Sequence, residues 1–156
     1  MPIAPEHRWL YPIDWPQLSR LIRFGRAKGR CERCGRPHGQ AVTHMGDGRW
    51  WDEEGQAWRD GQGRRLRRLP LPEEVERRWP RPPVLPGLPE GEPSPHLPVT
   101  RVVLASAHLD HDPGNNRARN LAALCQRCHM LHDAPEHRRR RWIKAFRLRA
   151  VRDLFG

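Results

Sequence analysis

The sequence predicts a small α+β domain in which a β-hairpin and a helix are held together by a four-cysteine metal site. Two C-x-x-C pairs, Cys31/Cys34 and Cys125/Cys128, stand far apart in the chain and together match the ligand set of a structural zinc site. A run of β-branched residues precedes the second pair, and segments with helical periodicity flank both pairs. With 156 residues, 37% of them hydrophobic, the chain is expected to be one domain, 1–156, with a modest core.

The first segment, residues 14–38, is expected to be a helix that leads into the first cysteine pair. Asp14 is a candidate helix cap, and Pro16 fits the first turn of a helix. Gly35 follows the cysteine pair and supplies the backbone freedom that a tight metal-binding turn requires. Three apolar residues fall on one face and predict the buried side of the helix: Leu18, Leu21 and Ile22.

Residues 39–99 are expected to form an insertion rich in tryptophan and proline. Within it, residues 48–59 predict a hairpin whose turn runs over residues 52–55. Three tryptophans are expected to pair across its strands: Trp50, Trp51 and Trp58.

The second part of this insertion holds ten prolines between Pro70 and Pro98. That density excludes a sheet or a long helix and favours extended conformations. The stretch is either a flexible loop or an ordered arm that wraps the domain. We favour the arm because it contains apolar side chains that need burial: Trp79, Val84, Leu85, Leu88 and Leu97.

Residues 100–134 are expected to form the core of the domain. A strand is predicted over residues 99–107, where β-branched residues are frequent, and a short second strand over 120–124. The segment between them, 112–119, carries strong turn signals. These elements together predict a β-hairpin.

Two helices are expected after the hairpin. The first is predicted to begin near Cys125 and to end at Pro135, because proline removes a backbone donor. The second is predicted over residues 136–154 and is rich in arginine. Four of its residues recur at helical spacing: Trp142, Phe146, Arg149 and Leu154.

The four cysteines are expected to bind one structural zinc ion. Thiolates are soft ligands that select zinc, and two C-x-x-C turns supply a tetrahedral site without an open position. The alternative is a redox pair or unpaired buried thiols, which the repeated C-x-x-C spacing disfavours. We predict that the substitution Cys125→Ser removes zinc and unfolds the domain.

A second group of polar residues, with harder ligand atoms, surrounds the predicted hairpin. Asp110 and His111 are adjacent at a strand end, so their side chains point to different sides. One can therefore ligate a metal ion while the other contacts a water molecule. His129 can supply a second ligand from the helix, and Asn120 suits a position that ties the loop by bonds from its amide to the backbone. Two auxiliary candidates follow His129 at helical spacing: His132 and Asp133.

Taken together, these residues resemble a known motif. The order Asp110-His111, then Asn120-Leu121, then Leu124-Cys125-x-x-Cys128-His129 is similar to the HNH endonuclease motif of the ββα-metal (His-Me finger) superfamily. The upstream C-x-x-C resembles the zinc-stabilised four-cysteine branch of that family. Residues 108–111 and 125–133 further resemble small HNH proteins of phages and mobile elements. The resemblance covers residues 8–38 and 100–137, and leaves the insertion and the basic tail unmatched.

The resemblance implies a metal-dependent endonuclease that hydrolyses phosphodiester bonds in DNA. His111 then matches the general base, Asn120 the asparagine that orients the loop, and Asp110 and His129 the ligands of one catalytic Mg²⁺ or Mn²⁺ ion. The expected products are 5′-phosphate and 3′-hydroxyl ends, with nicking by a monomer and paired cuts by a homodimer. The role of His132 stays open, because many relatives carry another residue there. His108 is a candidate contact to substrate or to a metal ligand.

The charge of the chain favours DNA as the partner. There are 29 Lys+Arg against 18 Asp+Glu, a formal net charge of +11, and nearly all the cations are arginines, which bind phosphate in a bidentate manner. Alternatively, any individual arginine is a solvated surface charge that contacts no phosphate. The candidate phosphate contacts lie on the first and last helices: Arg20, Arg23, Arg138, Arg139, Arg140, Arg141 and Lys144.

Two rival functions stay open on the sequence alone. One is a zinc-knuckle protein that binds DNA without cleaving it. The other is a nuclease that depends on a partner, within a phage packaging or recombination assembly, or one that acts on RNA. No signal peptide and no run as long as a membrane span is apparent. We therefore expect a cytoplasmic protein with reduced cysteines and no membrane partner.

Overall fold

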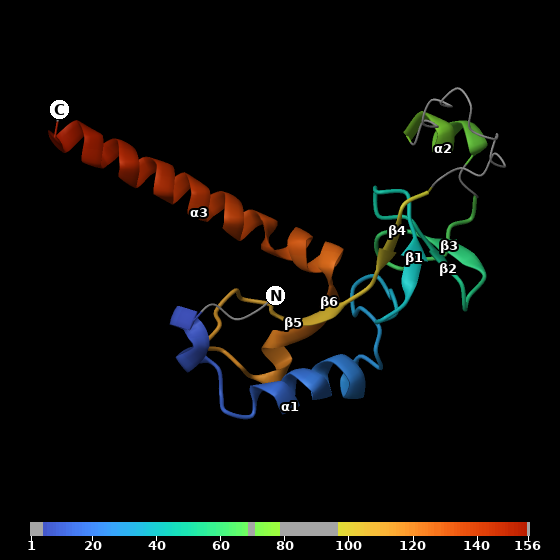
Figure 1. The fold of residues 1–156 in the computed structure, drawn as a ribbon, viewed down its shortest axis with the longest axis horizontal. Helices are drawn as coiled ribbons and strands as arrows, with labels where there is room; N and C mark the ends of the chain where they lie inside the picture. Colours follow the sequence, from blue (N-terminus) through green and yellow to red (C-terminus); the bar gives the residue numbers. More distant parts are fainter. Residues whose placement is uncertain (1–4, 69–70, 79–96, 156) are drawn as a thin grey trace, which may run out of the picture. The chain divides into compact units, whose positions relative to one another are not determined.

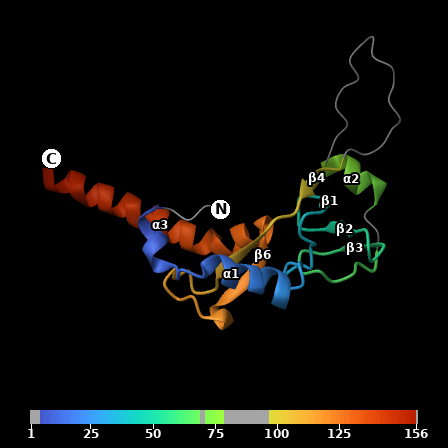
Figure 2. The same cartoon turned by 60° about the horizontal axis from the view of Figure 1, so that its bottom comes forward.

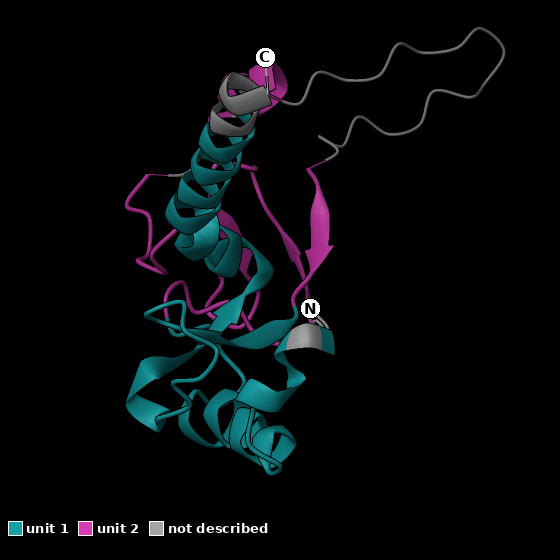
Figure 3. Cartoon of the chain, turned by 90° about the vertical axis from the view of Figure 1, so that its left-hand side faces the viewer, with its two compact units in different colours: residues 1–32, 103–156 teal, residues 33–102 magenta. Residues whose placement is uncertain are grey.

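The computed structural model describes residues 5–68, 71–78 and 97–155. The chain divides into two compact units, residues 1–32 with 103–156 and residues 33–102 (Figure 3). Helices and two-stranded antiparallel sheets occur together in the described residues. The mixed α+β class expected from the sequence is therefore present.

The first unit is built on a β-hairpin that leads directly into a helix. Strand β5 (Leu104–His108) pairs antiparallel with β6 (Leu121–Cys125), from the pair Leu104↔Cys125 to the pair His108↔Leu121. A short 3₁₀ turn, η3 (Ala118–Asn120), enters β6, and α3 (Gln126–Phe155) begins at the next residue after it (Figure 1). The second strand is therefore where the sequence predicts it, shifted by one residue.

Strand β6 is buried along its whole length. All five of its residues are buried, because helical segments pack on both of its faces. In Figures 1 and 3 the α1 region lies on one side of the hairpin and the start of α3 on the other. The core of this unit is small and mostly aliphatic: Ile22, Leu104, Ala107, Leu121, Ala123 and Leu124.

The N-terminal helical region differs from the helix expected over residues 14–38. A 3₁₀ segment, η1 (Pro5–Leu10), precedes α1 (Trp15–Arg20), which continues as π-helical turns in η2 (Leu21–Arg26). Asp14 stands at the start of α1 but makes no capping bond with its side chain.

The buried face of this region also differs from the expectation. Ile22 is buried as expected, but Leu21 is 62% exposed. The π turns explain the difference: the amide of Ala27 bonds the carbonyl of Ile22, five residues back, which changes the angular spacing of the faces.

The single strand expected over residues 99–107 is two strands in two different sheets. Strand β4 (Val99–Arg101) pairs with β1 (Ala41–Thr43), whereas β5 pairs with β6. The change occurs at Val102 and Val103. The amide of Val102 donates to Gln40 O at 2.8 Å, and that of Val103 donates to the side chain of Gln126 at 3.0 Å. The segment expected to be one strand is therefore two, because its two halves form hydrogen bonds with different partners distant in sequence.

Helix α3 passes through Pro135 rather than ending there. The proline removes one hydrogen bond to the preceding turn. Two ion pairs support the helix on its C-terminal side, from Glu136 to Arg139 and to Arg140. The two helices expected after the hairpin are thus one helix of 30 residues. No helix in the described part of the chain is long and apolar enough to cross a membrane.

The second unit contains the tryptophan hairpin that the sequence predicts. Strand β2 (Trp50–Asp52) pairs antiparallel with β3 (Ala57–Arg59) (Figure 2). Trp51 faces Trp58 across the strands, with ring centroids 5.9 Å apart. Trp50 instead pairs with Arg59 in register and is fully buried, since alternate residues of a strand point to opposite faces.

The proline-rich segment begins with a short helix, α2 (Pro72–Arg78). Proline at the first helical position is compatible with a helix, because that position lacks an intrahelical amide partner in any case. Arg49 forms ion pairs with Glu74 and Asp47, and Arg78 donates to Met45 O at 2.6 Å. The arm expected from Trp79 to Leu88 lies outside the described residues.

Candidate functional site

The two C-x-x-C pairs come together as one four-cysteine cluster. Cys31 and Cys34 follow η2, Cys125 ends β6, and Cys128 lies in the first turn of α3. All four are buried, none more than 3% exposed, and their sulfur atoms all lie within 4.8 Å of one another. Four thiolates about 2.3 Å from one zinc ion would lie roughly 3.8 Å apart. The cluster can therefore hold a structural metal ion such as zinc.

The first cysteine turn relies on two glycines with left-handed backbones. Gly35, the glycine expected to free this turn, has φ of +76°. Gly63 has φ of +83°, and a β-carbon there would lie 2.8 Å from the carbonyl oxygen of Cys34. Only a residue without a side chain allows this close approach. No local pattern marks Gly63, because its partner is distant along the chain.

The carboxylate of Glu32 aligns the first cysteine turn with strand β6. The amide of Glu32 donates to Ala123 O at 2.9 Å, and the Glu32 side chain accepts from the amide of Ala123 at 2.6 Å. Arg26 holds that carboxylate with two bonds of 2.9 and 2.8 Å. The amide of Cys125 also donates to the sulfur of Cys31 at 3.3 Å. These contacts hold the segment around Cys31 beside the end of β6, which carries Cys125.

Asp110 lies in the loop after β5, where three donors engage its carboxylate. Oδ1 accepts from the amide of Asp112 at 2.9 Å and from Asn120 Nδ2 at 2.8 Å, and Oδ2 accepts from Asn115 Nδ2 at 2.6 Å. The side-chain bond from Asn120, followed by the other two bonds, lowers the pKa of Asp110 to about 2. The carboxylate is therefore ionised throughout the physiological range.

Asn120 braces the same loop from the start of β6. Besides Asp110, its Nδ2 donates to the carbonyl oxygen of Asn115 at 2.9 Å, and its own carbonyl accepts from the amide of Leu109 at 2.8 Å. These bonds join the two ends of the loop, since Asn120 and Asp110 are ten residues apart in the sequence. The residue therefore fixes the path of the loop that carries His111.

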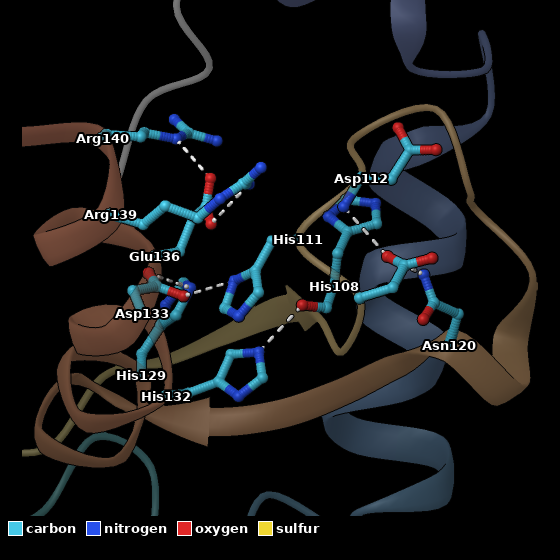
Figure 4. A network of polar contacts seen from close by, with 11 residues as sticks. His108, His111, Asp112, Asn120, His129, His132, Asp133, Glu136, Arg139 and Arg140 are labelled. Atoms are coloured by element: carbon cyan, nitrogen blue, oxygen red, sulfur yellow. Dashed lines mark hydrogen bonds and ion pairs between the residues drawn. The ribbon is translucent and has the colours of Figure 1, made fainter. Parts of the chain in front are cut away.

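His111 contacts two residues of α3, Asp133 and His132, and His129 contacts the same Asp133 carboxylate (Figure 4). Its Nδ1 is 3.4 Å from Asp133 Oδ1, and His129 Nε2 is 3.3 Å from Asp133 Oδ2. The imidazole rings of His111 and His132 stack at 4.3 Å between centroids. The backbone of His111 has φ of +62°, an unusual conformation for a non-glycine residue that is often found at functional sites.

The chemical state of two of these histidines follows from their surroundings. Burial lowers the pKa of His129, and the Asp133 carboxylate opposes that shift. A neutral imidazole is the form that binds a metal. His132 Nε2 lies 3.0 Å from the carbonyl oxygen of His108. Because a carbonyl only accepts, that nitrogen carries the proton, and Nδ1 is left with a lone pair in the neutral ring.

The ring of His108 packs against aromatic residues of the first unit. Its ring stacks on Trp15, with centroids 5.6 Å apart, and meets Tyr11 edge to face at 5.7 Å. Its Nε2 lies 3.0 Å from Asn116 Oδ1, and Asn116 Nδ2 donates to Leu10 O at 2.8 Å. His108 thus links the N-terminal segment to the loop after β5.

An open pocket of about 200 Å³ lies over the histidines. It combines residues from the N-terminal segment, from β5 and the loop after it, and from the N-terminal half of α3. Its lining is mostly polar: His7, Tyr11, His108, His111, Pro113, His129, Asp133, Glu136, His137 and Arg140. The pocket is accessible to a ligand and is bounded by imidazoles, carboxylates and an arginine.

The sequence predicted part of this constellation. His111, His129 and Asp133 come together, and His132 joins them, but Asp110 faces Asn115 and Asn120. Five lining residues were missed: His7, Tyr11, Pro113, Glu136 and His137. No local pattern marks His7 and Tyr11, because they come from the far end of the chain. Glu136 could have been found, since it lies seven residues after His129 and so on the same face of a helix.

The candidate phosphate contacts differ in their exposure. Arg23 donates to Ser19 O at 3.2 Å and to Leu104 O at 3.4 Å, so it holds η2 against β5. Arg20 is exposed on α1. The others form an exposed basic segment of α3: Arg138, Arg139, Arg140, Arg141 and Lys144.

Comparison with protein-family models, with curated proteins and with solved structures found no match.

Proposed function

We propose that this protein is a metal-dependent DNA endonuclease of the HNH type, which hydrolyses phosphodiester bonds to 5′-phosphate and 3′-hydroxyl ends. The observation that carries the proposal is the meeting of His111, His129 and Asp133 beneath an open polar pocket. These residues come from the loop that joins the two strands of a β-hairpin and from the helix that follows the hairpin. A base, metal ligands and access for a phosphate are the parts that metal-assisted hydrolysis requires.

His111 is the general base in this proposal. Its imidazole lines the pocket, and Asp133 faces its Nδ1. With Nδ1 turned toward a carboxylate, the ring carries its proton on that side, and Nε2 is left to accept a proton from water. The resulting hydroxide then attacks phosphorus in line with the leaving oxygen.

Asp110 and His129 are the proposed ligands of a divalent ion, Mg²⁺ or Mn²⁺, as the resemblance implies. Because the Asp110 carboxylate bonds Asn115 and Asn120 instead of facing α3, it would have to turn toward His129 to share an ion with it. Asp110 is ionised, and burial favours the neutral form of His129, so both side chains have the protonation state that a ligand needs. Asp110 Oδ2 accepts one bond from Asn115 and keeps a further lone pair. An ion bound there would offset the negative charge that develops on the phosphate oxygens.

Zinc is the proposed occupant of the four-cysteine cluster, with a structural role. Four buried thiolates leave no open coordination position for a substrate. The ion would connect the segment that ends η2 to the end of the β5–β6 hairpin. It thereby fixes the start of α3, from which His129 and Asp133 project.

DNA is the proposed substrate because of the basic segment of α3. Arg140 belongs both to this segment and to the lining of the pocket, so a phosphate backbone that follows the exposed arginines reaches His111. Contacts of this kind position the substrate without reading its sequence. Binding is therefore expected to weaken steeply as salt rises.

Cleavage of supercoiled plasmid by the purified protein with Mg²⁺ or Mn²⁺ tests the proposal. The expected result is nicking that His111→Ala abolishes and a chelator suppresses, while the zinc content and the circular dichroism spectrum of the variant match the wild type. Equal cleavage by both proteins would reject His111 as the base. Tight, salt-sensitive binding without cleavage by either would replace the nuclease by a zinc-knuckle DNA-binding protein.

A further inference from the structure

A group of ligand atoms in the first unit is richer in nitrogen than a magnesium site needs. His111, His132 and Asp133 each offer one ligand atom, and these three atoms all lie within 4.8 Å of one another. His129 stands at the other oxygen of the same carboxylate. Imidazole suits zinc, nickel, cobalt and copper, whereas Mg²⁺ prefers carboxylate, carbonyl and water oxygens.

The distance from His111 to Asp133, and that from His129 to the same carboxylate, match the separation of two ligands of one ion. A nitrogen and an oxygen each about 2.1 Å from a tetrahedral ion lie roughly 3.4 Å apart. His111 Nδ1 is 3.4 Å from Asp133 Oδ1, and His129 Nε2 is 3.3 Å from Asp133 Oδ2. Both separations exceed the 2.7–2.9 Å that is usual, as a rough range, for a charge-assisted hydrogen bond.

The surroundings leave the group available to a cation. His132 Nε2 bonds the carbonyl oxygen of His108, which orients the ring and leaves Nδ1 as the ligand atom. Glu136, the next carboxylate along the helix, is engaged by Arg140 at 2.9 Å. Asp133 therefore supplies the carboxylate of the group, and the open pocket gives an ion a path to it.

We propose that His111, His132 and Asp133 form a second metal site, selective for a borderline divalent transition-metal ion such as Zn²⁺, Co²⁺ or Ni²⁺. Two imidazoles and one carboxylate provide three ligands and leave a position for water or for His129. This site shares no ligand with the four-cysteine cluster, and at most His129 with the Asp110/His129 pair.

Occupation of this site has a consequence for activity that rests on the proposed function. An ion bound at His111 Nδ1 takes the lone pair of that nitrogen, so the neutral ring carries its proton on Nε2. Nε2 then has no lone pair with which to accept a proton from water. Transition-metal ions added beyond the structural zinc are therefore expected to inhibit cleavage supported by Mg²⁺.

Titration of the zinc-loaded protein with Co²⁺, followed by visible absorption, tests the site directly. Cobalt bound by nitrogen and oxygen ligands gives weak visible bands, whereas cobalt bound by thiolates gives intense charge-transfer bands in the near ultraviolet. The expected result is one Co²⁺ bound per chain with weak bands and no release of zinc. His132→Ala and Asp133→Asn should each weaken this binding by about tenfold or more.

His137→Ala is the matched control, because His137 lines the same pocket but lies outside the group. It should bind Co²⁺ as the wild type does. Unchanged Co²⁺ affinity in His132→Ala, at wild-type zinc content and melting temperature, would overturn the site. So would charge-transfer bands, since they would place the cobalt at the cysteines.

The binding measurement separates this proposal from the nuclease. Co²⁺ binding that depends on His132, in a protein that cleaves nothing, would keep the metal site and reject the proposed function. Cleavage that depends on His111, without Co²⁺ binding at this group, would do the reverse. Asp133 would then act only through its contact with the His111 ring.

Discussion

The substitution Cys125→Ser removes one of four buried sulfur atoms that lie within 4.8 Å of one another. Structural zinc contributes roughly 10–16 kcal/mol in small zinc-binding domains at neutral pH, whereas the whole stability of a domain is about 5–15 kcal/mol. Shared equally over four ligands, the loss of one weakens zinc binding by about 2.5–4 kcal/mol, or roughly a hundredfold to a thousandfold. The variant is therefore expected to lose its zinc and its cooperative fold together.

Zinc content by elemental analysis and thermal melting by circular dichroism measure these two losses. Ala122→Ser is the matched control, because it introduces the same hydroxyl at a buried position of the same strand without touching a sulfur. It should keep one zinc per chain and melt only modestly earlier. A Cys125→Ser protein that retains one zinc, or that is free of zinc and melts like the wild type, would refute a structural metal site.

Three further predictions concern the core, the loop and the basic helix. Leu121→Ala should destabilise the protein by about 2–5 kcal/mol in urea unfolding, since Leu121 is fully buried, while Met130→Ala, at an exposed position, should change stability by less than about 0.5 kcal/mol. Asn120→Ala should raise the pKa of Asp110 from about 2 toward its ordinary value, because it removes the largest stabilising bond of the carboxylate; the check is carbon-13 NMR titration, and an unmoved pKa would contradict the assignment. Arg138→Gln should lower the slope of log binding constant against log salt by about one if Arg138 contacts phosphate; an unchanged slope would make it a solvated surface charge.

The metal cluster and the hairpins could be predicted because short-range patterns encode them. The C-x-x-C spacing forms a metal-binding turn whatever its surroundings, and its repetition limits how the two turns can pair. The tryptophan hairpin and strand β6 follow from turn residues and β propensity over a few positions. Such signals are local and are readable without the fold.

Two local expectations were wrong, for different reasons. The β-rich run over residues 99–107 divides at Val102 because its halves find hydrogen-bond partners in different sheets, which the local pattern does not contain. Pro135 does not end α3, because proline removes a single amide donor while the helical turns continue to Phe155 on its C-terminal side. The proline was therefore too strong a stop signal when taken by itself.

The sequence by itself determined the four-cysteine set and the helical spacing of His129, His132 and Asp133, because both depend only on separation along the chain. Tertiary structure alone decided that His111, rather than Asp110, faces that helix. The left-handed backbone of His111 and the bonds from Asn115 and Asn120 to Asp110 turn the two neighbours apart. The direction of a side chain in a loop depends on bonds made across the fold, which no spacing specifies.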